Sequence, residues 1–527
     1  MAETAFFIKG VCRRGRAMTE ITTTAAMIAR HARRMPEAVA VVEVGQRRTW
    51  RDLAGHLAGT IGLLEAGGIR RGMLAGIEIG RFRYASLLVM LACEAIGAVA
   101  TTFTRLDLER DDPVLPDCER LILLGSDLES TQAPAGWSAG TVVVPANHPD
   151  GLPSSLPSSL PGGLPGGLPV PAALSALTAP PDADRIVRIS RTSGATGRPK
   201  AVPITHAVQQ RIIAQRIAFL PPEVVVSARF LCLYSLSVRG AYTRTYAALQ
   251  AGGTVYFAFK EEVPALLRNG AVNWLLAIVG EAEAIARQTE RLAGGYLLFE
   301  MIGARVPRPL RDLLRRTLGA TVRVTYSSNE TNTVSFNDDD DVGTLIPSAE
   351  ARVVDAAGHD VPMGQTGLIW VRTATMATGY WNDPARTASA FVDCWYRTND
   401  VGFMPEPGRL VVLGRADDML NVGGVKLPPG PIEDELKALP GVRDAALVTI
   451  AGPLGADTLL VALEVAPDAS LADLHQAARV ILRRYVAAFA FLPLPSFPRT
   501  DTGKIRRPEI EAAFRRGHAS RGQANWS

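Results

Sequence analysis

Residues 191–200 read RTSGATGRPK and follow a strand-like stretch, residues 184–189. The glycines and small hydroxyl residues of this segment can turn backbone N–H groups inward, forming a concavity of the kind that cradles phosphate oxygens. Lys200 adds a compact positive charge beside them. The spacing is not that of the GxxxxGK[ST] phosphate loop, because a proline precedes the lysine and an alanine follows it. The segment indicates a phosphate-binding loop after a strand, although such a sequence can also be an ordinary turn.

Helical and strand-like patterns alternate on both sides of this loop. Residues 50–66 and 84–96 have helical patterns with a short apolar strand between them, and the alternation resumes over residues 186–412. Alternation of strands and helices is typical of an α/β fold with a parallel sheet. We therefore expect a large N-terminal α/β domain, residues 18–413, built of layered sheets and helices.

The pattern of helical and strand-like segments changes near Leu413. Two helical and two strand-like patterns follow it, at residues 431–439, 445–450, 458–465 and 471–488. A short run of this kind predicts a small α+β C-terminal domain, residues 414–527, joined to the first by a hinge near residues 415–418.

Two segments are expected to lie outside these domains. Residues 151–169, GLPSSLPSSLPGGLPGGLP, combine proline and glycine with too little apolar mass to pack, which predicts a flexible surface insertion. Near the N-terminus, a very short apolar run precedes its arginines rather than following them, unlike a signal peptide. We expect residues 1–17 to be an N-terminal extension and the protein to be cytoplasmic.

The composition excludes several classes of protein. Of the 527 residues, 47% are hydrophobic and 20% charged, as in ordinary globular proteins. The net charge of +4 comes without long Lys/Arg tracts, so we expect no nucleic-acid partner. The five cysteines form no CxxC pair, which argues against a disulfide framework and a cysteine zinc site. The most apolar stretch, residues 84–100, contains Glu94 and is shorter than the roughly 20 residues of a membrane span.

Two polar segments follow strand-like runs. Residues 325–331, TYSSNET, contain Glu330, an oxygen ligand that suits Mg²⁺, and Tyr326, which could stack on a planar base. Residues 395–400, WYRTND, end in Asp400, whose carboxylate could accept hydrogen bonds from both hydroxyls of a ribose. Taken singly, each segment can also be a polar turn after a strand.

Two more segments lie in the C-terminal part of the chain. Residues 413–426, LGRADDMLNVGGVK, coincide with the expected domain boundary, and residues 498–507, PRTDTGKIRR, place Lys504 in a turn-like stretch. A solvated turn and an exposed lysine are the plain interpretations. Lysine is rare here, however, with six among 56 basic residues, and Lys200 and Lys504 both fall in such segments.

In this order and at these separations, the five segments resemble the motifs of the adenylate-forming superfamily, which includes acyl-CoA synthetases, nonribosomal peptide adenylation domains and luciferase-like enzymes. The family patterns TSGTTGxPKG, YGxTE, Y[RK]TGD, GRxDDxIKxxG and PKTxxGKxxR all have counterparts. Residues 302–305 resemble the family's GGAxL turn, and residues 379–384 its GYxNxPE segment. The resemblance covers about residues 20–515.

The resemblance implies an activity and its cofactors. A carboxylic acid would react with ATP, in the presence of Mg²⁺, to give an acyl-adenylate and pyrophosphate, and a thiol would then give a thioester and AMP. CoA or phosphopantetheine would supply the thiol. The leading hypothesis is that the protein is an acid–CoA ligase. The alternatives are a stand-alone adenylation enzyme that loads an acyl carrier protein and a catalytically silent nucleotide-binding scaffold on the same fold.

The resemblance also implies roles for single residues. Lys504 would be catalytic, because its ammonium can bridge the attacking carboxylate and the α-phosphate, and its domain would rotate about Asp417. Glu330 would ligate Mg²⁺. The implied phosphate-loop residues are Thr192, Ser193, Gly194, Thr196, Gly197 and Lys200. Asp400 and Arg415 would contact the ribose. The implied residues of the adenine pocket are Gly303, Ala304, Arg305 and Tyr326. The implied thiol tunnel is lined by Gly423 and Gly424.

Several positions depart from the family patterns. Ala195 replaces a usual Thr or Ser, Ser327 a usual Gly, and Asn329 the Thr that contacts the α-phosphate. Asn399 replaces a Gly in the ribose motif, and Asn421 a Lys near the hinge. The amide of Asn329 can still donate a hydrogen bond, so we expect a catalytic contact from it and weaker nucleotide handling rather than loss.

Residues 233–242, LYSLSVRGAY, correspond to the family's acyl-pocket segment. Ser237 falls where amino-acid-activating domains place an Asp that binds the substrate ammonium. No acidic residue lies between Ser227 and Lys260. A buried ammonium without a counter-charge is costly, so the sequence favours an uncharged aliphatic or aromatic acid. Arg239 or Arg244 could instead bind a second carboxylate or a polar group, or could simply face solvent. The predicted pocket walls are Ser237, Val238, Ala241, Thr325 and Thr333.

Overall fold

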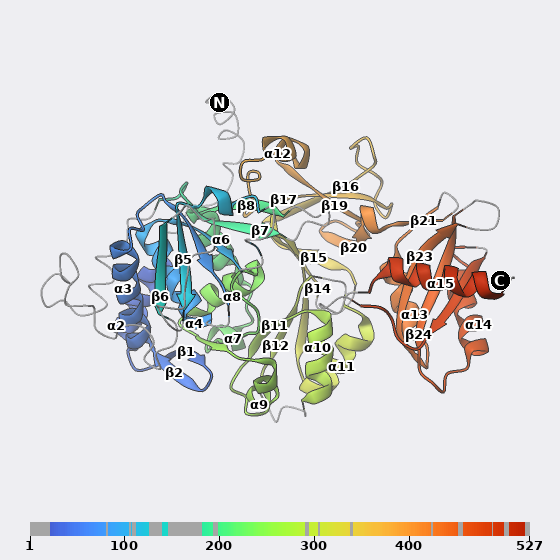
Figure 1. Ribbon diagram of the computed structural model, residues 1–527, viewed down its shortest axis with the longest axis horizontal. Helices are drawn as coiled ribbons and strands as arrows, with labels where there is room; N and C mark the ends of the chain where they lie inside the picture. Colours follow the sequence, from blue (N-terminus) through green and yellow to red (C-terminus); the bar gives the residue numbers. More distant parts are fainter. Residues whose placement is uncertain are drawn as a thin grey trace, which may run out of the picture.

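The structure is a computed structural model (Figure 1). It describes residues 22–80, 83–104, 107, 112–125, 140–145, 182–192, 199–289, 295–303, 306–337, 341–422, 425–451, 457–486, 488–499 and 505–521. The predicted extension, residues 1–17, and the predicted insertion, residues 151–169, lie outside these ranges.

The first sheet has the strand order β6-β5-β3-β4-β7-β8. Its strands are β3 (Leu74–Glu78), β4 (Val99–Phe103), β5 (Arg120–Gly125), β6 (Gly140–Pro145), β7 (Ile186–Thr192) and β8 (Lys200–Thr205). Neighbouring strands are parallel up to β7, and β8 turns back antiparallel to it. The predicted phosphate-binding loop therefore connects the last two strands at the edge of this sheet.

The second sheet is longer, in the order β16-β17-β19-β20-β15-β14-β13-β12-β11-β9-β10-β1-β2, with β18 paired to β19. One group of its strands comprises β1 (Val39–Glu43), β2 (Gln46–Thr49), β9 (Arg229–Cys232), β10 (Thr254–Phe257), β11 (Trp274–Ala277), β12 (Leu298–Met301) and β13 (Thr321–Ser328). The other comprises β14 (Asn332–Asn337), β15 (Gly343–Leu345), β16 (Ala349–Val354), β17 (Gly367–Thr373), β18 (Phe391–Val392), β19 (Trp395–Phe403) and β20 (Arg409–Arg415). Strands from β9 to β13 pair in parallel, and from β13 to β20 the pairing is antiparallel.

Helices fill the space between the two sheets. The main ones are α2 (Thr24–Arg34), α3 (Trp50–Ala66), α4 (Arg83–Ile96), α6 (His206–Ala218) and α8 (Arg239–Gln250). Together they join Ile77 and Ile122 of the first sheet to Phe230 and Val255 of the second in one buried cluster. Removing this apolar surface from water is the main force that holds the two layers together.

Other helices cover the outer faces. The second sheet packs its opposite face on α9 (Val263–Arg268), α10 (Val279–Gln288) and α11 (Arg308–Leu318), as Figure 1 shows. Shorter elements lie nearby: α7 (Pro222–Val225), α12 (Pro384–Ala390), and the 3₁₀ turns η2 (Leu115–Asp117), η3 (Lys260–Glu262) and η4 (Ala416–Asp418). The sheets and helices thus form the layered α/β arrangement that the sequence predicts.

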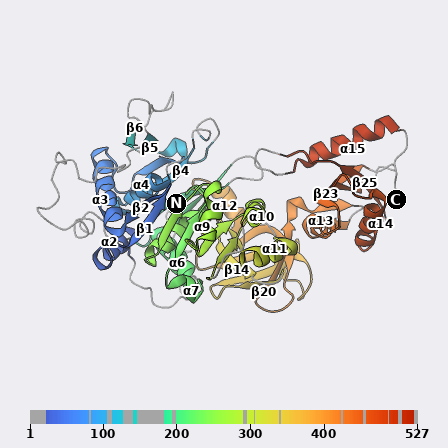
Figure 2. The same ribbon diagram turned by 90° about the horizontal axis from the view of Figure 1, so that it is seen from below.

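A separate small unit follows β20 (Figures 1 and 2). It contains the hairpin β21 (Leu420–Val422) and β22 (Val425–Leu427), and a sheet of β23 (Val442–Ala451), β24 (Asp457–Val465) and β25 (Phe489–Leu494). Its helices are α13 (Pro429–Lys437), α14 (Leu471–Leu482) and α15 (Arg507–Arg521). One face of the sheet packs on α13 and α14, and the other on α15 through Ile510 and Phe514. The predicted fold class, a large α/β part with a small α+β C-terminal part, is confirmed.

One local expectation differs from the structure. The helix predicted over residues 471–488 ends at Leu482, and the strand β25 that follows it, Phe489–Leu494, was not predicted. The cause is tertiary, because β25 pairs in parallel with β24 and buries Phe489 in the core of the small unit. At the junction of the two parts, β20 continues to Arg415, and η4 separates it from β21.

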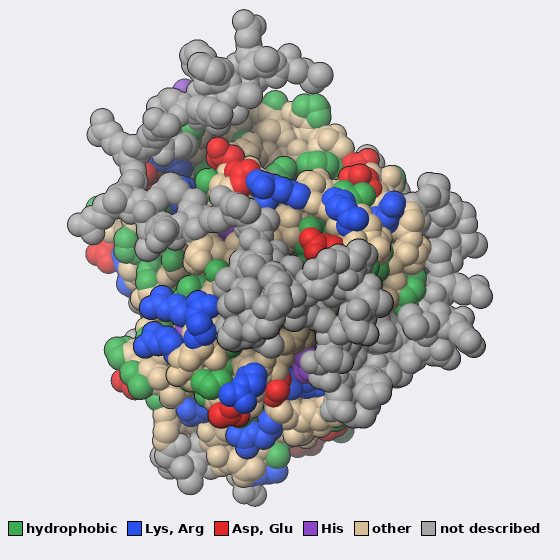
Figure 3. Space-filling model, turned by 90° about the vertical axis from the view of Figure 1, so that its left-hand side faces the viewer, with side chains coloured by type: hydrophobic (Ala, Val, Ile, Leu, Met, Phe, Trp, Pro, Cys, Tyr) green, Lys and Arg blue, Asp and Glu red, His purple; other side chains and the backbone are tan. Residues whose placement is uncertain are grey.

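Among the described side chains that are visible in the view of Figure 3, none form a broad stripe of one charge. Arginine and lysine side chains gather in several separate places on this face, with acidic side chains close by. Within the described ranges, no helix is both long and apolar enough to cross a bilayer.

Candidate active site

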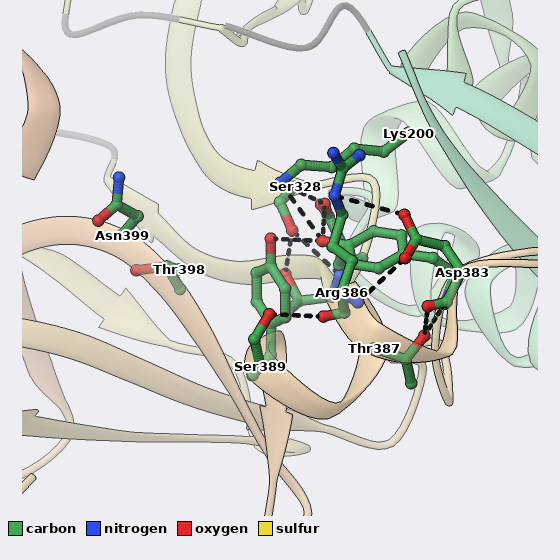
Figure 4. A network of polar contacts seen from close by, with 12 residues as sticks. Lys200, Ser328, Asp383, Arg386, Thr387, Ser389, Thr398 and Asn399 are labelled. Carbon is green, nitrogen blue, oxygen red and sulfur yellow. Dashed lines mark hydrogen bonds and ion pairs between the residues drawn. The ribbon is translucent and has the colours of Figure 1, made fainter. Parts of the chain in front are cut away.

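The hairpin of β7 and β8 brings Lys200 to the site. Thr192 pairs with Lys200, so the two ends of the predicted phosphate loop lie opposite each other. Lys200 Nζ lies 3.9 Å from Glu330 Oε1 and 3.4 Å from Tyr380 Oη. Figure 4 shows Lys200 directed toward Ser328 at the end of β13. The loop residues Ser193, Gly194, Thr196 and Gly197 lie outside the described residues, so their phosphate-binding roles stay predictions.

Glu330 lies in the tight turn between β13 and β14, and several hydrogen bonds hold that turn. Ser328 Oγ accepts a bond from the Thr331 backbone N–H at 3.1 Å, and the Glu330 carbonyl accepts one from the Ala377 N–H at 2.7 Å. Thr373 Oγ1 donates to the Thr331 carbonyl at 2.7 Å. The Glu330 side chain is consequently fixed in place, and the residue is only 5% exposed.

Two tyrosine hydroxyls lie beside the carboxylate of Glu330. Tyr380 Oη donates to Glu330 Oε1 at 2.9 Å and lies 3.4 Å from Tyr396 Oη. Burial, and next the negative charge of Glu330, raise the pKa of both tyrosines, so each remains a protonated hydroxyl donor at neutral pH. The sequence analysis did not single out these tyrosines, although both fall within segments that it matched to the family.

The segment after Tyr380 is anchored by a short helix. Tyr380 N donates to Thr387 Oγ1 at 2.9 Å, and Asp383 caps α12 by accepting the Arg386 N–H at 3.0 Å. Figure 4 shows Asp383, Arg386 and Thr387 together beside the Lys200 network. This scaffold sets the position of the Tyr380 hydroxyl.

A second cluster forms around Asp400 on β19. Tyr326 Oη donates to Asp400 Oδ2 at 2.5 Å, and Arg415 Nη1 lies 3.5 Å from Asp400 Oδ1. Thr398 Oγ1 accepts the Asp400 backbone N–H at 3.0 Å. Burial raises the pKa of Asp400, the Tyr326 hydroxyl and the Arg415 charge oppose that effect, and the charge of Glu330 adds to it. The two clusters therefore lie within electrostatic reach of each other.

Asn399 explains one departure from the family pattern. Its φ is 62°, in the left-handed region where glycine is usual and asparagine is the best tolerated alternative. Asn399 Nδ2 donates to Asp417 Oδ2 at 2.6 Å, and Asp417 Oδ2 also lies 4.0 Å from Arg415 Nη2. The proposed hinge residue is thus held by the strand that carries Asp400.

The predicted adenine-pocket residues are described only in part. Met301 of β12 pairs with Val324 of β13, which places Gly303 and Tyr326 near the same edge of the sheet. Gly303 has a φ of 88°, and a Cβ there would meet nothing within 4 Å, so backbone conformation rather than space favours glycine. Ala304 and Arg305 lie outside the described residues. Asn329 is half-buried in the turn before Glu330.

The C-terminal assignments fall largely outside the described ranges. Lys504, the principal catalytic candidate, and Gly423 and Gly424 of the predicted thiol tunnel are all in this group. Arg499 and Ile505, on either side of Lys504, form an isolated antiparallel bridge. The roles of these three residues stay predictions.

The predicted acyl-pocket residues differ in exposure. Val238 is 38% exposed, whereas Ala241 is fully buried. Thr325 and Thr333 are also buried, and neither hydroxyl has a hydrogen-bond partner among the residues that the structure describes. Ser237 Oγ donates to Ser235 Oγ at 3.0 Å.

Arg239 and Arg244 are both buried, with exposures of 6% and 0%. The interpretation that these two arginines face solvent is therefore wrong. Their burial follows from the position of α8 between the two sheets.

The residues present suit Mg²⁺ bound together with nucleotide phosphates. Across the described ranges, no group of three His, Cys, Asp or Glu side chains could hold a metal by itself. Mg²⁺ is commonly held by one or two carboxylates plus substrate phosphates, and the single carboxylate of Glu330 beside Lys200 fits that pattern.

Comparisons with known proteins agree with this site. A family model described as AMP-binding enzyme matches residues 28–381. The acyl-CoA ligase sidI of Aspergillus fumigatus is 27% identical over 62% of this chain and 60% of its own length. The fatty acid–[acyl-carrier-protein] ligase MmaC of Mycobacterium marinum is 24% identical over 92% of this chain and 96% of its own length.

Solved structures share the fold. ATP-bound MatB from Rhodopseudomonas palustris superposes with a TM-score of 0.73 at 20% identity, covering 93% of this chain and 99% of MatB. The o-succinylbenzoate CoA synthetase MenE from Bacillus subtilis gives a TM-score of 0.71 at 18% identity, over 92% and 98% of the two chains. Because the family model matches well over half of the chain, this protein belongs to the AMP-binding enzyme family.

Proposed function

We propose that this protein is an ATP-dependent acid–thiol ligase. A carboxylate oxygen of the substrate attacks the α-phosphorus of ATP, forming an acyl-adenylate as the bond to pyrophosphate breaks. A thiolate then attacks the acyl carbon, giving a thioester and releasing AMP. The observation that carries this proposal is the convergence of Lys200, Glu330, Asp400 and Arg415 from four separate segments on one described site.

The side chains of this site match the parts of ATP. Lys200 would neutralise phosphate oxygens, and Asp400 would accept the hydrogen bonds of the ribose hydroxyls, with Arg415 beside it. Glu330 would hold Mg²⁺, which supplies positive charge to the phosphates. Lys200 and Glu330 neutralise each other in the absence of nucleotide, so neither is left as an uncompensated charge before ATP arrives.

We assign the final catalytic group to the C-terminal part. Lys504 would stabilise the charge shared between the attacking carboxylate and the α-phosphate. Rotation of residues 414–527 about Asp417 would then replace Lys504 with the thiol channel at Gly423 and Gly424. Lys504→Ala should abolish adenylate formation while ATP binding persists, and unchanged pyrophosphate exchange would refute this role.

Two thiol acceptors have support. CoA is the leading one, because the curated relatives include the acyl-CoA ligase sidI. A carrier-protein phosphopantetheine is the second, because the similarity to MmaC, named as an acyl-carrier-protein ligase, extends over 92% of this chain. Adding free CoA or a holo carrier protein to preformed acyl-adenylate, and measuring which one releases AMP, separates them.

Pyrophosphate exchange across short, medium, aromatic and dicarboxylic acids tests the proposed function as a whole. Glu330→Gln and Asp400→Asn should each lower the exchange rate. Glu37→Gln is the matched control, because the Glu37 side chain is 70% exposed and pairs only with exposed Arg51 among described contacts. Absence of exchange with every acid would favour the silent nucleotide-binding scaffold instead.

A further inference from the structure

Arg239, the first residue of α8, is buried and has no hydrogen-bond partner among the described residues. The residue is 6% exposed, and all three of its guanidinium nitrogens are buried without a hydrogen bond to that part of the chain. Leaving a buried guanidinium with none of its five N–H donors satisfied is strongly unfavourable. Such a group is normally kept where an anion from outside the chain completes it.

Arg244 lies just over one turn further along α8 and shows the opposite situation. Arg244 Nε lies 2.6 Å and Nη2 3.3 Å from the two carboxylate oxygens of Glu300, and Nη1 donates to the Gly240 carbonyl at 3.1 Å. Trp274 Nε1 donates to the same carboxylate at 2.6 Å. The described part of the chain therefore supplies a complete partner for Arg244 and none for Arg239.

Two more buried arginines surround Arg239. Arg188 Nη2 donates to the Leu236 carbonyl at 2.8 Å, and its guanidinium stacks on the ring of Tyr242 at 4.0 Å. Arg216 Nη2 donates to Asn332 Oδ1 at 3.2 Å. Within the described ranges, Arg188 Nε and the Nε and Nη1 of Arg216 have no hydrogen-bond partner. Burial lowers the pKa of all three arginines, to about 9 for Arg216.

Two carboxylates act on this cluster, and each also faces another cation. The charge of Glu330, which lies near Lys200, acts on Arg239, and the charge of Glu300, which pairs with Arg244, acts on Arg216. The Tyr242 hydroxyl is buried with no hydrogen-bond partner among the described residues and adds an unused donor. The N-cap of α8, Val238, offers no side-chain cap, so the positive end of the helix dipole adds to the same field.

The cluster adjoins the proposed adenylation site. Arg216 is bonded to Asn332, two residues beyond Glu330 in the chain, and Glu330 acts electrostatically on Arg239. An acid whose one carboxylate is activated near Glu330 could therefore extend its other end toward Arg239.

We propose that Arg239, flanked by Arg188 and Arg216, binds a second carboxylate of the substrate, so that the acid activated is a dicarboxylic acid. A carboxylate matches the planar guanidinium with two parallel N–H···O bonds. This inference rests on the proposed function, since it names the acid that the same site activates. It departs from the uncharged acid that the sequence favoured and takes up the alternative left open there, a second carboxylate bound by Arg239; burial excludes the interpretation that this arginine faces solvent.

Pairs of acids with equal carbon number test the inference: butanoic against butanedioic acid, and hexanoic against hexanedioic acid. In pyrophosphate exchange, the wild type should prefer the dicarboxylic member by on the order of 100- to 1,000-fold in kcat/KM, as expected for a buried charge left unpaired by the wrong substrate. Arg239→Met should abolish or reverse this preference through the KM for the acid, with the KM for ATP unchanged. Arg268→Met, at an exposed position of α9, is the matched control and should keep the preference.

The outcomes separate the two proposals. Wild-type exchange that is equal or faster with monocarboxylic acids overturns the dicarboxylate inference and leaves the proposed function intact. Absence of exchange with any acid overturns the proposed function, and the melting temperature then decides the inference. Butanedioate or hexanedioate should raise the Tm of the wild type and of Arg268→Met but not of Arg239→Met. No such increase in Tm overturns the inference. If Arg239→Met does not fold, Arg239→Lys replaces it in the test. This variant keeps the positive charge but cannot form two parallel hydrogen bonds, so its preference for the dicarboxylic acid should lie between those of the wild type and of a variant without the charge.

Discussion

The buried pair of Arg244 and Glu300 allows a quantitative prediction for Glu300→Gln. Burial alone would raise the pKa of Glu300, but Arg244, together with Arg216 and the Trp274 N–H, lowers it to about 2 from an ordinary value of 4.5. This difference corresponds to about 3 kcal/mol of folding stability at neutral pH. Glu300→Gln removes that contribution and leaves Arg244 buried without its counter-charge, which independently predicts a cost of about 3–5 kcal/mol.

The sign of the pH dependence follows from the direction of the shift. Because the pKa of Glu300 is lower in the folded chain, its contribution is fully present above pH 4.5 and is lost as the pH falls from there toward 2. Urea denaturation of the wild type and of Glu300→Gln should therefore differ by about 3 kcal/mol at pH 7. The gap should narrow steadily on acidification below pH 4.5.

A double-mutant cycle supplies the control. Arg244→Met combined with Glu300→Leu removes both charges of the pair, and its stability should recover relative to either single change because neither member of the pair is left without the other. A loss below about 1 kcal/mol for Glu300→Gln at pH 7, or a gap that does not depend on pH, would contradict the reasoning.

Three further changes probe the nucleotide site. Asp400→Asn should raise the Kd for AMP about 10- to 100-fold, because a carboxylate that accepts hydrogen bonds is replaced by an amide; a competitive-binding titration with AMP measures this. Since burial raises the pKa of Asp400, ATP binding should also weaken on acidification at a higher pH than an ordinary aspartate predicts. Tyr380→Phe removes the donor to Glu330 and should lower the exchange rate without affecting folding, as circular dichroism would verify. Asn399→Ala should cost about 1 kcal/mol in urea unfolding, whereas Asn399→Gly should cost less, because only the alanine strains a left-handed backbone.

Much of the fold could be predicted where local signals are strong. The helix expected over residues 50–66 is observed with the same bounds, because Thr49 and Asp52 form a capping box at its start. Strand β25 was missed, since its identity depends on pairing with β24, about thirty positions earlier in the chain. The sequence pattern within one segment does not predict which distant strand it will pair with.

The residues of the candidate site likewise divide into those that could be predicted from the sequence and those that could not. Lys200, Glu330, Tyr326, Asp400 and Arg415 could be identified because each lies in a recognisable motif, and the structure brings them together. The burial of Arg239 could not be predicted. The sequence between residues 227 and 260 does not reveal that Glu300, on β12, pairs with Arg244, or that Arg239 has no such partner among the described residues.

The hydrogen bond between Asn399 and Asp417 has a mechanical consequence. Thr398 bonds the backbone of Asp400 on one side of this asparagine, so the carboxylate proposed to bind the ribose and the linker to the small unit share a single stretch of backbone. In the proposed rotation about Asp417, the linker must release Asn399 immediately beside the proposed nucleotide contact. The proposed rotation of the small unit and the proposed binding of the nucleotide would thereby be coupled through two adjacent peptide groups. Coupling of this kind needs no chain of contacts between distant residues.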